Sequence, residues 1–171
     1  LQAEHALSGI DMALWDALGR ATGEPAWTLL GYRRSWPKLP YASVLFGGTA
    51  PDTLAKARAI RNKGFRAAKF GWGPFGAGTV KADVDQLHAA REGLGKDGVL
   101  LVDAVTVWVE DLKAGLKRLK ALAEVKATWL EEPFVSGALD AYKALAKRSR
   151  VKLAGGDKIV VTFYLPEHGG D

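Results

Sequence analysis

Apolar and polar positions alternate along the chain with two different periods. Short apolar runs rich in strand-forming residues are each followed by a longer segment in which apolar residues recur every three or four positions. The first pattern is typical of strands and the second of amphipathic helices. The expected strands are 39–46, 65–71, 97–104, 126–134 and 151–157, and the expected helices between them are 51–64, 79–95, 109–124 and 137–149.

Strands separated by helices of this length predict parallel β/α units, because a parallel connection needs a long crossover. Such units build either a doubly wound sheet or a barrel. The first 36 residues differ, since 4–25 has the apolar stripe of one amphipathic helix that ends at Gly23 and Pro25. We expect this helix to pack outside the β/α units.

Composition narrows the class of protein. The 171 residues are 48% hydrophobic and 25% charged, which is typical of a soluble globular domain, and no apolar run approaches the roughly 18 residues that span a bilayer. We therefore expect a cytoplasmic protein without a membrane partner. The net charge of +5 comes from Lys and Arg spread along the expected helices beside acids, which indicates solvated helix surfaces and no nucleic-acid partner.

Acidic residues end three successive expected strands. Asp103, Glu131 and Asp157 are 28 and 26 residues apart, about one β/α unit each. In parallel β/α folds the C-terminal strand ends meet at one rim, so these carboxylates converge there and repel each other without a cation. A chain with no cysteine holds metals through oxygen or imidazole, and Mg²⁺ prefers oxygen. The pattern predicts a magnesium site; the alternative is that each acid only caps the following helix.

Two neighbouring residues extend the candidate site. Glu132 points away from Glu131 on an alternating strand, so we expect it to support the ligands or to cap the following helix. Lys69 lies near the end of the second expected strand, where an ammonium could abstract a proton or stabilise developing charge. The alternative for Lys69 is a side chain that simply reaches solvent.

These residues carry a family resemblance. The runs SGIDMALWDALGRATGEPAWTLLG, GFRAAKF, VDA, WLEEP and AGGD, in this order, resemble the mandelate racemase and muconate lactonizing enzyme subgroup of the enolase superfamily, from residue 4 to about 157. The resemblance implies a TIM-type (β/α) barrel with one Mg²⁺ on three carboxylates, which map to Asp103, Glu131 and Asp157. It also implies a small carboxylate substrate that loses the proton α to its carboxylate.

The chain departs from the family pattern in informative places. The Lys-x-Lys motif of the family reads Lys69-Phe70-Gly71, so its second lysine, the base, is missing. Val105 stands where an asparagine is frequent, and the histidine base of the family falls beyond residue 171. The resemblance therefore implies a partial barrel of about four and a half of the eight units.

A division of the chain follows from the resemblance. Residues 1–36 are expected to be a linking helix and the lead-in from a capping domain, residues 37–157 the partial barrel, and residues 158–171 an atypical tail. A partial barrel exposes strand edges, which predicts pairing with another copy in a homo-oligomer.

The implied activity is that of a magnesium-dependent lyase, namely a sugar-acid dehydratase acting on an acid sugar. Lys69 would be an electrostatic partner, and this chain alone would be inactive. A racemase or isomerase of the same superfamily is one alternative. Another is a non-catalytic fragment that associates with itself.

A glycine motif gives a further alternative. Residues Gly71–Gly76 match G-x-G-x-x-G after a strand, which is typical of a dinucleotide-binding domain. Pro74, however, removes one of the backbone N–H groups that hold a pyrophosphate. We instead expect a flexible loop near the substrate, with Trp72 or Phe75 lining the pocket.

Overall fold

The computed structural model describes residues 2–34 and 36–155. The chain divides into two units, Leu1–Lys38 and Leu39–Asp171, and each is described by itself. The first contains helices α1 (Gln2–Thr22) and α2 (Ala26–Leu29), and Gly23, with a φ of +72°, ends α1. Within the described residues no helix has the length and apolarity to cross a membrane. The packing of the first helix and the three-part division of the chain stay predictions.

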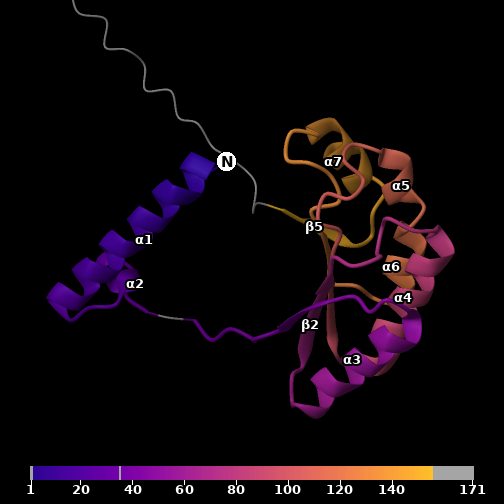
Figure 1. Ribbon diagram of the computed structural model, residues 1–171, viewed down its shortest axis with the longest axis horizontal. Helices are drawn as coiled ribbons and strands as arrows, with labels where there is room; N and C mark the ends of the chain where they lie inside the picture. Colours follow the sequence, from indigo (N-terminus) through magenta and orange to yellow (C-terminus); the bar gives the residue numbers. More distant parts are fainter. Residues whose placement is uncertain (1, 35, 156–171) are drawn as a thin grey trace, which may run out of the picture. The chain divides into compact units, whose positions relative to one another are not determined.

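A parallel sheet is the framework of the second unit (Figure 1). Its five described strands follow one another in chain order, each pairing in parallel with the next. The strands are β1 (Ala42–Leu45), β2 (Ala67–Gly71), β3 (Val99–Asp103), β4 (Trp129–Glu131) and β5 (Lys152–Ala154), and the helices are α3 (Ala50–Asn62), α4 (Val80–Leu94), α5 (Leu112–Leu116), α6 (Leu119–Glu124) and α7 (Leu139–Ala146).

The helices of this unit lie on one face of the sheet (Figure 1), with α3 packed on α4 and α4 on α6. A doubly wound sheet reverses its strand order and carries helices on both faces, whereas a barrel keeps chain order with all helices outside. The order β1 to β5 is therefore that of an arc of a TIM-type barrel.

Side chains that alternate along the strands give the sheet one apolar face and one polar face. The core contains Phe70 from β2, Val102 from β3 and Leu130 from β4, all fully buried against apolar residues of the helices such as Leu87 and Leu122. Residues at the intervening positions lie on the opposite face, which the helices leave uncovered. Polar side chains of β2, β3 and β4 occupy this second face.

The expected helix 109–124 is two helices. It breaks between α5 and α6 at Lys117 and Arg118, because the Arg118 side chain turns inward and donates to Asp83 of α4. The expected strand 126–134 is also shorter, since Glu132 has a φ of +40° and ends β4. Local apolar periodicity carried no signal for either interruption.

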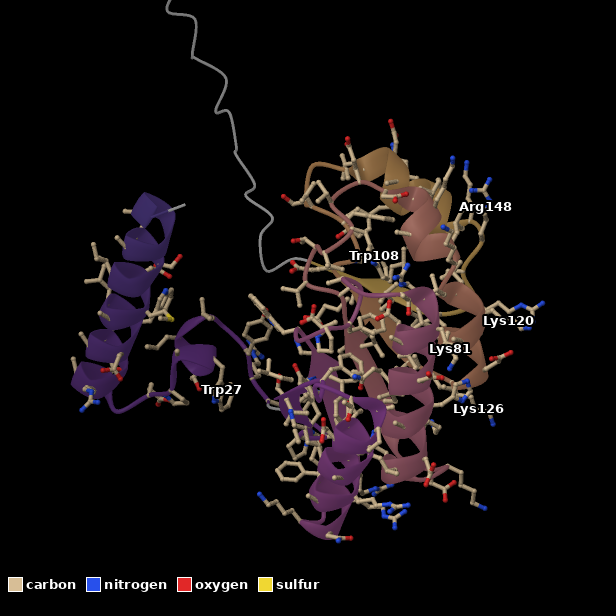
Figure 2. All side chains as sticks on the ribbon, turned by 45° about the vertical axis from the view of Figure 1, so that its right-hand side comes forward. Trp27, Lys81, Trp108, Lys120, Lys126 and Arg148 are labelled. Carbon is tan, nitrogen blue, oxygen red and sulfur yellow. The ribbon has the colours of Figure 1, made fainter. Side chains whose placement is uncertain are left out.

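Basic side chains are spread over the helical side of the second unit, where Figure 2 labels Lys81, Lys120, Lys126 and Arg148. Lys81 pairs with Asp85 at 2.7 Å and Lys120 lies 3.8 Å from Glu124, both one helical turn apart on exposed surfaces. The described residues thus have the solvated helix surface that the sequence predicts. The absence of a nucleic-acid partner stays a prediction.

Gly93 permits the close approach of α4 to α3. A Cβ at this position would lie 2.4 Å from Ala57 Cβ and 2.8 Å from the Leu54 carbonyl oxygen. We expect Gly93→Ala to lower the free energy of unfolding by about 1–3 kcal/mol through overpacking, measured by urea denaturation. Adding Ala57→Gly should recover part of this loss. An unchanged or raised stability, as helix propensity alone predicts, would contradict this packing.

The sheet ends in β1 on one side and β5 on the other within the described residues. Unpaired strand edges favour association. We predict that the purified chain sediments as a dimer or larger species whose population rises with concentration. The alternative is that residues 158–171, which lie outside the described residues, cover an edge. A compact monomer with an uncovered edge in sedimentation velocity and hydrogen exchange contradicts both.

Candidate metal-binding and catalytic site

The strand register sets three residues at one level of the sheet. Gly71 of β2 pairs with Asp103 of β3, which pairs with Glu131 of β4. Lys69 lies two residues before Gly71 and therefore on the same face. The structure thus brings Lys69, Asp103 and Glu131 together at the C-terminal ends of three neighbouring strands.

Lys69 bridges the two acids. Its Nζ lies 2.7 Å from Glu131 Oε1 and 3.3 Å from Asp103 Oδ2, and the three side chains are only 11–14% exposed. The other carboxylate oxygens also have donors. The Val105 N–H donates to Asp103 Oδ1 at 2.9 Å, and the Trp129 indole donates to Glu131 Oε2 at 3.0 Å. Both carboxylates are therefore held in fixed orientations.

The charge state of Lys69 follows from this contact. Burial alone lowers the pKa of Lys69, but the hydrogen bonds and charges of Glu131 and Asp103 outweigh it and raise this pKa above its ordinary value. The ammonium consequently keeps its proton at neutral pH. In this arrangement Lys69 is the counter-ion of Asp103 and Glu131, and its role toward a substrate stays a prediction.

The third predicted ligand, Asp157, lies outside the described residues. Strand β5 pairs with β4 through Ala154, which is opposite Glu131 and three positions before Asp157 in the sequence. Within residues 2–34 and 36–155 no three acidic or histidine side chains gather as a metal site. The structure provides a pair of carboxylates, and the three-carboxylate magnesium site stays a prediction.

Gly71 stands at the position where the family motif has its second lysine. A Cβ at this position would lie 2.9 Å from Asp103 Cβ and 3.3 Å from its Cγ. A longer side chain here would therefore displace Asp103 from its place beside Lys69. In this chain position 71 therefore contributes no side chain to the site, and Asp103 lies directly beside it.

Glu132 turns to the other face of the sheet, as the alternation predicts. It is buried and lines a pocket of about 230 Å³ with Tyr142 and Leu153. Burial raises the pKa of Tyr142, and the charge of Glu132 raises it further. The expectation of a helix cap is not met, because Ala138 is the N-cap of α7 and no side chain caps that helix end.

The two aromatic residues of the glycine-rich loop have different places. Trp72 is 62% exposed and lines a pocket of about 310 Å³ with Lys69 and Asp103. Phe75 is 3% exposed and stacks on Phe46 with 4.8 Å between ring centroids. Phe75 therefore belongs to the hydrophobic core rather than to the pocket, because its ring is apolar and the loop folds back onto β1.

The glycine-rich loop is not arranged as a dinucleotide site. The Gly76 N–H donates to Asp83 Oδ1 at 2.9 Å instead of facing outward, and α4 begins only at Val80 after the N-cap Thr79. A pyrophosphate needs free N–H groups at a helix start that follows the strand directly. Together with the strand order, this contradicts the dinucleotide-binding alternative.

Left-handed backbone conformations cluster around the site. Non-glycine residues with positive φ follow the ends of β2, β3 and β4, namely Trp72 at 55°, Val105 at 51°, Thr106 at 59° and Glu132 at 40°. Each costs about 1–2 kcal/mol, and β-branched residues adopt this region least readily. Such strain gathers at functional sites, where the surrounding structure holds it in place.

Two polar residues of the site were missed in the sequence. Trp129 donates to Glu131, and Ser43 of β1 pairs with Lys69 and lines the same pocket as Trp72. The signal for Trp129 was its spacing, because residues two apart on a strand share a face. Ser43 had no comparable signal, since its register with Lys69 is a long-range property.

The fold and the site together define a class of protein. Carboxylates and a lysine at the C-terminal ends of successive strands, on a chain-ordered parallel sheet with helices on one face, are typical of a β/α-barrel enzyme. The family model described as "Enolase C-terminal domain-like" matches residues 52–163. The model of the "Mandelate racemase / muconate lactonizing enzyme, N-terminal domain" matches residues 1–31. The chain belongs to the mandelate racemase and muconate lactonizing enzyme family of the enolase superfamily.

Known relatives extend the comparison. The 3,6-anhydro-alpha-L-galactonate cycloisomerase of Streptomyces coelicolor is 32% identical over 92% of this chain and 42% of its own length. A crystal structure of a predicted mandelate racemase from Rhodobacter sphaeroides matches with a TM-score of 0.83 at 59% identity, covering 92% of this chain and 40% of that one. The D-glucarate dehydratase from Agrobacterium tumefaciens complexed with magnesium matches with a TM-score of 0.75 at 29% identity, covering 86% and 40%.

The family contains several chemistries. Relatives of this chain include sugar-acid dehydratases, cycloisomerases, racemases and epimerases. The chain spans about two fifths of the length of the curated relatives that it matches.

Removing the Lys69 ammonium leaves two carboxylates facing each other without a cation. We expect Lys69→Met to lower the free energy of unfolding at pH 7, in EDTA, by about 2 kcal/mol. Lys81→Met is the control, because the ion pair of Lys81 is exposed and should contribute less than about 0.5 kcal/mol. Equal losses in the two variants, measured by urea denaturation, would show that Lys69 does not neutralise this pair.

Proposed function

We propose that this chain contributes to a magnesium-dependent sugar-acid dehydratase, which removes the proton α to a carboxylate and expels a β-hydroxide. The observation that carries the proposal is the juxtaposition of Asp103 and Glu131 around a cation, at the strand ends of a chain in this family. Dehydratases of acid sugars among the relatives and a neighbour complexed with magnesium support the reaction and the metal.

The donor set fits Mg²⁺. Both carboxylates offer hard oxygens on neighbouring strands, and they already gather positive charge in the form of the Lys69 ammonium. Val105 and Trp129 orient Asp103 and Glu131 through their second oxygens, which is how ligand carboxylates are fixed in metal sites. In the proposal Asp157 is the third ligand. When bound, the ion would act as a Lewis acid toward the substrate carboxylate.

Lys69 would hold a substrate carboxylate by charge. Its ammonium stands between the two proposed ligands, 2.7 Å from Glu131 Oε1 and 3.3 Å from Asp103 Oδ2, which is a suitable place for an electrostatic partner of a metal-bound carboxylate. Position 71 offers no base, because it is glycine and Asp103 occupies the adjacent space. We therefore assign the essential base to a part of the barrel beyond this chain, and we expect the chain alone to be inactive.

A racemase or isomerase of the same superfamily is the second candidate, and the cycloisomerase relatives favour it. The dehydratase ranks first, because the absence of a lysine at position 71 disfavours a two-base racemization across the substrate. The non-catalytic alternative is that the chain folds, associates with itself and does not turn over.

Metal binding tests the proposal in the chain itself. We expect Mn²⁺, a paramagnetic substitute for Mg²⁺, to bind weakly, with a dissociation constant of about 1 mM or higher, because the site lacks the preorganisation of a whole barrel. Glu131→Gln should abolish this binding, whereas Asp85→Asn, an exposed acid on α4, should leave it unchanged. Electron paramagnetic resonance of free Mn²⁺ measures both.

Turnover provides the second half of the test. We expect no measurable dehydration of D-gluconate, galactarate or D-glucarate by the purified 171-residue chain with Mg²⁺. Dehydration that Glu131→Gln abolishes would show that the base lies within this chain. Mn²⁺ binding that survives both Glu131→Gln and Asp103→Asn would remove the basis of the proposed metal site.

A further inference from the structure

A buried ion pair lies outside the candidate site. Asp83, in the first turn of α4, accepts two donors of Arg118 on its Oδ2, from Nε at 2.7 Å and from Nη2 at 2.6 Å. The side chains are 1% and 5% exposed. Two apolar side chains of similar volume are frequently as stabilising as such a pair, because burying charges costs several kcal/mol. The pair therefore calls for an explanation beyond stability.

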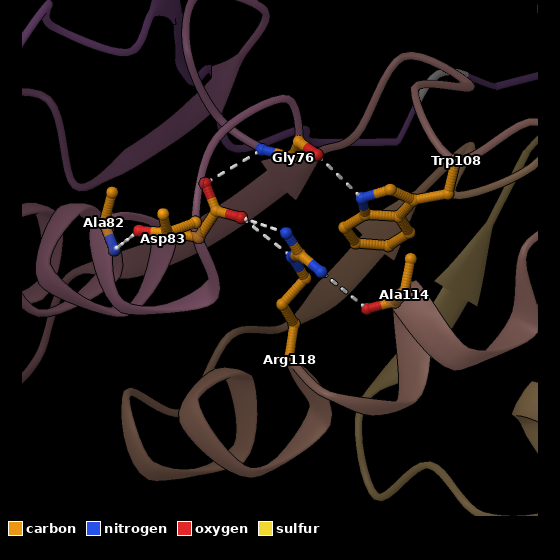
Figure 3. Close-up of polar contacts among 7 residues, drawn as sticks. Gly76, Ala82, Asp83, Trp108, Ala114 and Arg118 are labelled. Atoms are coloured by element: carbon orange, nitrogen blue, oxygen red, sulfur yellow. Dashed lines mark hydrogen bonds and ion pairs between the residues drawn. The ribbon is translucent and has the colours of Figure 1, made fainter.

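The pair holds two loops together (Figure 3). The second oxygen of Asp83 accepts the Gly76 N–H at 2.9 Å, and the Gly76 carbonyl accepts the Trp108 indole N–H at 3.2 Å. The guanidinium of Arg118 lies over the Trp108 ring, 5.0 Å from its centroid, and donates to the Ala114 carbonyl at 2.9 Å. Helix α4, the β2–α4 loop and the β3–α5 loop thus meet at one ion pair.

The contact between these loops is tight. Gly76 has a φ of +85°, and a Cβ there would lie 2.3 Å from Val107 Cγ1 and 3.1 Å from Trp108 Nε1. Phe75, one residue earlier, stacks on Phe46 and lies 6.2 Å from the Trp108 ring. The middle of the glycine-rich loop is therefore anchored, contrary to the expectation of a flexible loop.

Both loops begin at the candidate site. The β2–α4 loop starts with Trp72, which lines the pocket that contains Lys69 and Asp103. The β3–α5 loop starts directly after Asp103 and supplies the Val105 N–H that orients this acid. Anchoring both loops in their middle, at Gly76 and Trp108, thus limits the motion of the groups at which the loops begin.

We propose that Asp83 and Arg118 are positioning residues, which fix the two loops so that Trp72 stands at the pocket mouth against the carbon chain of a polyhydroxy acid. The role of Trp72 as a wall for this substrate class rests on the proposed function, whereas the anchoring of the loops does not. Neither member of the pair touches substrate. Each acts through Gly76 and Trp108.

Hydrogen exchange tests the anchoring. In Asp83→Asn the amides of Gly76, Ala77 and Val107 should exchange about tenfold faster, the factor that about 1.4 kcal/mol of local stability represents. The amides of β3 should be unchanged. Asp85→Asn, two residues away on the exposed side of α4, is the matched control and should change neither group. Arg118→Lys, which keeps the charge but loses the fork, should lie between wild type and Asp83→Asn.

The indole NMR signals distinguish a pair that positions Trp72 from a pair that only stabilises the fold. In ¹⁵N-labelled protein the indole signals of Trp72 and Trp108, assigned through Trp→Phe variants, should both shift or broaden in Asp83→Asn and stay in place in Asp85→Asn. Trp108→Phe removes only the indole donor to Gly76 and tests the link if Asp83→Asn does not fold. It should also speed exchange at Gly76 and move the Trp72 signal.

Two outcomes would overturn the proposal. One is a uniform rise in exchange across the loops and β3, because that means the pair only stabilises the whole unit. The other is an unmoved Trp72 signal in both Asp83→Asn and Trp108→Phe. Mn²⁺ binding that survives both Glu131→Gln and Asp103→Asn would instead count against the proposed function, and it would leave the exchange and indole results intact.

Discussion

The parallel register of β2, β3 and β4 is the constraint on which the site depends. It sets Gly71, Asp103 and Glu131 side by side, and Lys69, one pleat below Gly71, reaches both carboxylates. Because Gly71 has no side chain, Asp103 can occupy the space beside it. A slip of one residue in any of these strands would turn its polar side chain into the apolar core. The core and the site therefore specify the same register.

The positive charge of Lys69 explains how Asp103 and Glu131 can lie close together in a largely buried position. Two carboxylates on adjacent strands repel, and their burial adds a desolvation cost. The Lys69 ammonium offsets both, and the Trp129 indole and Val105 amide complete the hydrogen bonding. A metal ion at this site would join a network whose oxygens already have assigned partners. The hydrogen bonds thus orient both acids on β3 and β4, the strands that also form the centre of the sheet.

The sequence predicted features that depend on local periodicity and failed on those that depend on distant partners. The strands ending at Asp103 and Glu131 follow from apolar runs, and the opposite direction of Glu132 follows from strand alternation. The break in the expected helix 109–124 did not follow, because it depends on Arg118 reaching Asp83 from 35 residues away. Phe75 was misplaced for a similar reason, since its partner Phe46 belongs to another loop.

Val105 orients a residue of the site through its main chain and not through its side chain. Its left-handed conformation directs a backbone N–H, and not a side chain, to Asp103. A main-chain donor is present whichever amino acid the codon specifies, with proline as the exception. A substitution at position 105 other than proline therefore keeps the N–H group that donates to Asp103. The left-handed φ of 51° strains the backbone of Val105, whereas the Asp103 carboxylate keeps its hydrogen bond.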